Sequence, residues 1–79
     1  MWRSEAVPWE LKPYITELRK AHAQHRGFEN PDTRRIGEDI YARFGHEGMV
    51  IACDAIRAQL GAEARSLEYE WSGIGEWLG

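Results

Sequence analysis

The sequence predicts an all-α fold in which three or four helices form a small bundle. Residues that favour helices, namely Ala, Glu, Arg and Leu, are frequent, whereas the chain of 79 residues contains only two Val and two Thr. In addition, no stretch between the Pro and Gly residues alternates polar with β-branched residues as a strand would. Both observations favour helices throughout.

A chain of this length forms one domain over residues 1–79. It is too short for two hydrophobic cores, and no repeat, low-complexity segment or long linker divides it. We expect residues 1–12 to form an N-terminal arm with a short helical turn, from which Trp9 and Leu11 fold back onto the core. Because so small a chain buries only about 60 to 65% of its unfolded surface, a core that continues into a second subunit is an alternative from the outset.

The first helix is expected to begin near Pro13, since proline is tolerated in an opening turn, where its missing N–H needs no partner. Gly27 is expected to end this helix. Before it, six residues recur at intervals of three and four and would therefore form a stripe along one face of the helix; they are Tyr14, Ile15, Leu18, Ala21, His22 and His25. This stripe predicts a helix that packs on its neighbours through one side.

The second helix has the clearest start signal in the chain. Asn30 is a good N-cap, and Pro31 suits the first helical position. Ile36, Ile40 and Phe44 then line one face before Gly45. The sequence therefore predicts a helix from Pro31 to Phe44 with these three side chains directed inward.

A third helix is expected directly after a short turn at residues 45–48, and it must cross the second helix or run antiparallel to it. A break at Gly61 gives it an ordinary length. The apolar spacing continues beyond this glycine, however, so residues 47–78 can also form one long C-terminal helix. Such a helix would require a dimer to cover its apolar stripe, and the sequence leaves both alternatives open.

Charge, hydropathy and cysteine content argue against a nucleic-acid-binding, membrane-spanning or secreted protein. The net charge is −3, and residues 46–79 carry two basic against six acidic residues, which disfavours a nucleic-acid partner. No apolar run approaches the roughly 20 residues of a membrane span, and residues 1–9 lack the apolar segment of a secretory signal. Cys53 cannot form an intramolecular disulfide. We therefore expect a cytoplasmic protein without membrane contact.

Residues capable of chemistry are present, but not in the patterns of known sites. His22 and His25 lie one helical turn apart, and His46 is a third potential ligand, so these histidines are weak candidates for a metal or small-ligand site. No zinc-binding motif accompanies them. Cys53 falls on an apolar stripe beside Asp54, whose charge opposes formation of a thiolate. We expect no cofactor, no metal and no catalysis.

Residues 31–60 offer a nucleic-acid alternative, because a helix, a short turn and a helix are the elements of a helix-turn-helix DNA-binding motif. The second of these helices opens with Glu47 and contains Asp54 beside a single Arg57. A recognition helix is expected to be basic, so we regard an accessory DNA-binding role as the weaker hypothesis.

The main functional hypothesis rests on apolar and aromatic residues near the C-terminal end. If this segment is helical, one face comprises Leu67, Trp71, Ile74 and Leu78, with Trp77 beside it, while Tyr69 points elsewhere. This strip either closes the core of the bundle or is an exposed patch, since Trp and Tyr are favoured anchors at interfaces. On the second alternative the protein is an interaction module that binds another protein or itself, as a homodimer.

Overall fold

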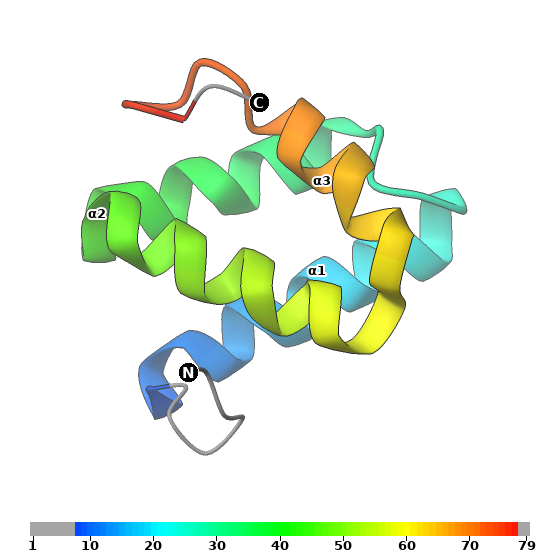
Figure 1. Ribbon diagram of the computed structural model, residues 1–79, viewed down its shortest axis with the longest axis horizontal. Helices are drawn as coiled ribbons and strands as arrows, with labels where there is room; N and C mark the ends of the chain where they lie inside the picture. Colours follow the sequence, from blue (N-terminus) through cyan, green and yellow to red (C-terminus); the bar gives the residue numbers. More distant parts are fainter. Residues whose placement is uncertain (1–7, 78–79) are drawn as a thin grey trace.

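The computed structural model describes residues 8–77, and 81% of this part of the chain is helix, with no strand. Its elements are the 3-10 helix η2 (Trp9–Leu11), α1 (Lys12–His25), α2 (Pro31–Leu60), the 3-10 helix η3 (Gly61–Glu63) and α3 (Ala64–Glu70) (Figure 1). The prediction of an all-α fold is confirmed. None of the helices in the described range combines the length and the apolar composition that a bilayer crossing requires.

α2 is the centre of the fold and is bent sharply at Gly45. This residue has φ 74° and ψ −169°, a conformation that glycine adopts readily. In Figure 1 the first half of α2 leads to the bend, and the second half returns from it in roughly the opposite direction. The helix predicted from Pro31 to Phe44 therefore ends where expected, but the turn is shorter than the expected residues 45–48. Gly48 already lies in the second half, where a Cβ would have no room beside Phe44.

The core lies where α1 and α3 pack on α2. Three of the six residues in the predicted stripe of α1 are buried there, namely Ile15, Leu18 and Ala21, and so are Ile36 and Ile40 of the first half of α2. Of the other stripe residues, Tyr14 and His22 are half-buried and His25 is exposed. Met49 and Ile56 add the inner face of the second half of α2. Phe44 is half-buried and packs against this cluster, with its ring 5.8 Å from that of Tyr14.

The start of α2 is fixed by a single side chain, as its sequence predicts. Asn30 Oδ1 accepts a hydrogen bond from the backbone N–H of Thr33 over 2.9 Å. At the same time, Asn30 Nδ2 donates to the carbonyl of Gly27 over 2.9 Å. The capping residue thus satisfies a donor that the first helical turn leaves unpaired and also ties the loop after α1 to α2.

The predicted break at Gly61 is confirmed, and the alternative of one helix over residues 47–78 is wrong. Gly61 has φ 62°, and η3 separates α2 from α3. α3 itself ends at Glu70, so the helix expected as far as residue 78 is wrong beyond this point. The physical reason is that Gly73 (φ 91°) and Gly75 (φ 57°) turn the chain through conformations outside the helical region.

Of the two N-terminal residues expected to fold back onto the core, one is buried. Leu11 is buried, with 1% of its surface exposed, whereas Trp9 is 74% exposed and does not fold back onto the core. These two positions lie two residues apart in the turn η2 and point to different sides. Burial of Leu11 uses the inner side of the turn, which leaves Trp9 on the outer side.

Candidate interaction surface

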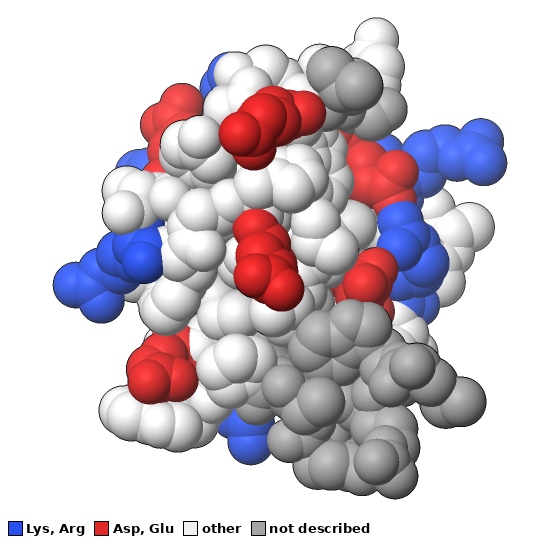
Figure 2. All heavy atoms as spheres, turned by 60° about the vertical axis from the view of Figure 1, so that its left-hand side comes forward, with Lys and Arg blue, Asp and Glu red and all other residues white. Residues whose placement is uncertain are grey.

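The segment considered for DNA binding consists of the two halves of α2. Its second half carries one basic side chain, Arg57, and this guanidinium is engaged: it donates to Asp54 over 2.9 Å and forms an ion pair with Glu68 of α3. A phosphate would have to compete with both carboxylates. On the face shown in Figure 2, acidic side chains stand singly among uncharged ones, and basic side chains lie toward the edges of the view. This charge pattern gives the nucleic-acid alternative no support.

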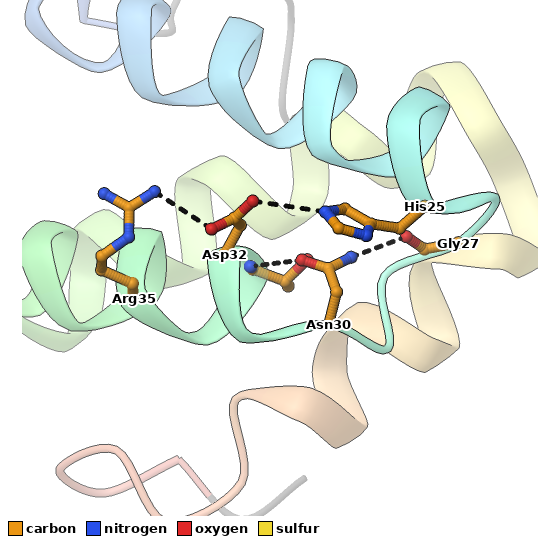
Figure 3. A network of polar contacts seen from close by, with 6 residues as sticks. His25, Gly27, Asn30, Asp32 and Arg35 are labelled. Carbon is orange, nitrogen blue, oxygen red and sulfur yellow. Dashed lines mark hydrogen bonds and ion pairs between the residues drawn. The ribbon is translucent and has the colours of Figure 1, made fainter.

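Two of the candidate histidines are each paired with a carboxylate of another element. His22 of α1 bonds to Glu63 of η3. His25, at the end of α1, places Nε2 3.3 Å from the carboxylate of Asp32 in the first turn of α2 (Figure 3). Asp32 also lies 3.4 Å from the guanidinium of Arg35. These two histidines therefore join elements of the fold, and each has a separate partner.

The third histidine, His46, lies at the bend of α2, close to residues 76 and 77. His46 Nδ1 is buried without a hydrogen bond and is 3.7 Å from a carboxylate oxygen of Glu76, while the imidazole ring is 5.7 Å from the ring of Trp77. Within residues 8–77, no group of three His, Cys, Asp or Glu side chains is placed to hold a metal ion. The structure does not bring the three histidines together.

Cys53 is buried between α2 and α3, with 2% of its surface exposed. The pKa of this thiol is raised to about 11: burial is the main cause, the Asp54 charge adds to the rise, and the Arg57 charge opposes it. The sulfur lies 3.8 Å from both Arg57 and Glu68. Because the thiol remains protonated near neutral pH, its role is that of a small buried side chain, and a nucleophile is not supported.

Most of the aromatic strip predicted near the C-terminal end belongs to the core of this chain. Leu67, Trp71 and Ile74 are buried. Trp77 is half-buried, and its indole N–H donates to the carbonyl of Glu68 over 2.9 Å. The remaining member of the strip, Leu78, lies outside the described residues. Of the two alternatives left open by the sequence, closure of the core is the one found for Leu67, Trp71 and Ile74.

Trp71 is the anchor of this segment. Its indole N–H donates to the carbonyl of Thr33 over 2.8 Å, although Thr33 lies 38 positions earlier in the chain. The ring packs directly on Gly37, one turn further along α2, where a Cβ would overlap the indole. A glycine on α2 thus provides the room that the indole of Trp71 needs.

Residues 71–77, which we call the C-terminal segment, are held along the first half of α2 by two further contacts. The guanidinium of Arg34 donates to the carbonyls of Glu70 and Ser72, each over 2.9 Å, and so satisfies acceptors that the end of α3 leaves unpaired. The backbone at Gly75 approaches the ring of Tyr41 so closely that a Cβ would overlap it. The segment is therefore fixed by specific complementary groups on α2.

The exposed aromatic residue of α3 is Tyr69, which is not a member of the predicted strip. Tyr69 is 74% exposed, because a residue two positions from both Leu67 and Trp71 points to the opposite side of a helix. Ala62, Arg65 and Tyr69 recur at intervals of three and four. This second stripe was the available sequence signal for an outward face on η3 and α3.

Beside Tyr69 the surface is hollowed between α3, η3 and the loop that follows α1. This shallow depression, which is largely open to solvent, has a volume of about 370 Å³ and is lined by Glu29, Ala62, Arg65, Ser66 and Tyr69; we call these five residues the Tyr69 hollow. The Ser66 hydroxyl donates to the carbonyl of Glu63 over 2.9 Å. The hollow therefore offers an exposed aromatic ring, one cation and one anion.

No family model, no curated protein and no solved structure matches this chain.

Proposed function

We propose that this chain is a small helical bundle that acts as a protein–protein interaction module and binds its partner through the Tyr69 hollow. The observation that carries the proposal is the 74% exposure of Tyr69 at the edge of a concave surface. Tyrosine is among the residues that contribute most to binding when a partner buries them, because it combines a large apolar area with a polar hydroxyl and few rotatable bonds.

The lining of the hollow fits a protein partner better than a small ligand. Small-molecule sites bury most of the ligand surface and orient it with a few convergent polar groups. Here Glu29, Arg65 and Tyr69 are exposed, and the Ser66 hydroxyl is already bonded within the chain. An exposed aromatic ring beside an arginine is instead a composition found at protein interfaces, where aromatic side chains and Arg are enriched.

We place this activity in the cytosol. Cys53 is a buried, unpaired thiol, and such a side chain is compatible with a compartment that keeps thiols reduced. The fold, as described over residues 8–77, is held by hydrophobic burial and capping contacts and does not depend on a disulfide.

Site-specific photo-crosslinking tests the proposal. Tyr69 is replaced by benzoylphenylalanine in the full chain, and the protein is irradiated in cells. We expect a discrete adduct of higher mass on denaturing gels, because the probe stands where a partner would lie. Trp9 offers a matched control position, since it is equally exposed, at 74%, and lies outside the Tyr69 hollow.

Two results would contradict the proposed function. Position 69 could form no adduct, or positions 9 and 69 could react alike with many proteins, as expected of any exposed aromatic probe. Circular dichroism of both variants checks that the helical fold is retained.

A further inference from the structure

The two charges of the Tyr69 hollow have opposite signs and come from different parts of the chain. Glu29 belongs to the loop between α1 and α2, whereas Arg65 belongs to the first turn of α3. Both are exposed, and within residues 8–77 neither takes part in an ion pair.

An interface between two identical chains related by a two-fold axis has a strict requirement. The same patch is used twice, so each group that one copy contributes must find its complement within that patch on the other copy. A patch of one sign repels its own copy. A patch that contains a cation, an anion, an apolar ring and a hollow beside the ring meets the requirement with its own residues.

We propose that the partner bound by the Tyr69 hollow is a second copy of this chain. Tyr69 of each copy enters the hollow of the other, and Glu29 of each copy faces the partner's Arg65. This inference rests on the proposed function and identifies the partner.

The contacts expected in such a dimer follow from the lining of the hollow. The ring of Tyr69 meets the methyl group of the partner's Ala62 and the guanidinium of the partner's Arg65, which is a favourable position for a cation over an aromatic face. The two Glu29–Arg65 pairs act at short range, where they oppose the general repulsion between two chains of net charge −3. The hollow is small, so the interface belongs at the low end of the known range of areas.

Sedimentation velocity over a concentration series up to about 1 mM, in low salt, gives the first test. The wild-type full chain is expected to shift reversibly from monomer to dimer. Tyr69→Ala is expected to raise the dissociation constant at least about tenfold, as for an interface anchor. Trp9→Ala, which removes an equally exposed ring elsewhere, is expected to leave the constant unchanged within about twofold.

Two charge variants provide a test that only this pairing passes. In Glu29→Arg the patch carries two cations, and in Arg65→Glu it carries two anions, so each variant alone is expected to repel its own copy and remain monomeric. An equimolar mixture of the two is expected to dimerise, because both pairs across the axis are then attractive. The double variant Glu29→Arg/Arg65→Glu restores one charge of each sign and is expected to dimerise alone.

The outcomes separate this inference from the proposed function. A wild-type chain that remains monomeric up to about 1 mM, or a dimer that persists in both single charge variants, overturns the assignment of a second copy. If position 69 still cross-links to a different protein in cells, the proposed function stands and the partner is another chain. If position 69 forms no adduct of any kind, the proposed function fails with it.

Discussion

The inner and outer sides of α3 carry aromatic residues in opposite roles. On the inner side, Trp71 follows the last turn and is covered completely, because Gly37 of α2 makes room for the indole and the Thr33 carbonyl accepts its N–H. On the outer side, Tyr69 lies two residues away with 74% of its surface exposed. The difference shows that the side of the helix sets whether an aromatic ring is buried or exposed, and that on the inner side Gly37 provides the room that the indole needs.

The largest loss of stability is expected when the buried ring on the inner side of α3, that of Trp71, is removed. Trp71→Ala removes a buried ring and leaves the Thr33 carbonyl without its indole donor, so we expect a loss of about 3 to 5 kcal/mol in the free energy of unfolding. Urea denaturation followed by circular dichroism measures this loss. A decrease below about 1 kcal/mol would mean that the C-terminal segment contributes little to the fold.

A smaller loss of stability is expected from a substitution at the contact between the C-terminal segment and Tyr41. Gly75→Ala introduces a methyl group against the Tyr41 ring at a residue with φ 57°, so both a clash and backbone strain arise. We expect a loss of about 1 to 3 kcal/mol. In a Tyr41→Ala background the clash is removed, so the same substitution should cost only about 1 to 2 kcal/mol of strain. An equal cost in both backgrounds would contradict the close contact.

The smallest change in stability is expected from removing an exposed aromatic ring. Tyr69→Ala and Trp9→Ala each remove an exposed ring, and we expect each to change the stability of the monomer by less than about 0.5 kcal/mol. Thermal or urea unfolding at low micromolar concentration, where the dimer would be scarcely populated, measures this change without a contribution from binding. A large loss for Tyr69→Ala would assign the ring to the fold and remove it from the interaction surface.

The start, the inner face, the bend and the end of α2 could be predicted from the sequence, because each depends on residues close together in the chain. The cap at Asn30 followed by Pro31 set the start of α2, and Ile36 and Ile40 showed its inner face at intervals of one turn. Gly45 and Gly61 marked a bend and an end, because each adopts a positive φ that other residues rarely take. In these cases the residues that determine the structure lie within one or two helical turns of each other.

The C-terminal segment could not be predicted in this way, because its contacts are distant in sequence. Apolar spacing suggested a helix through Leu78, but Gly73 and Gly75 end that periodicity. Trp71 is held by a carbonyl 38 positions away. The candidate surface could not be predicted for a related reason: the hollow beside Tyr69 is formed by the loop after α1, η3 and α3, which come together only after folding.

The contacts that fix the C-terminal segment also constrain the order of folding. The hydrogen bonds from Trp71 to Thr33 and from Arg34 to Ser72 each close a loop of 38 residues, and such closure has an entropic cost that local helical contacts do not have. The acceptor at Thr33 and the space at Gly37 exist only once the first half of α2 has formed. Docking of the segment is therefore expected as a late event, so substitutions there should accelerate unfolding while leaving the rate of folding nearly unchanged.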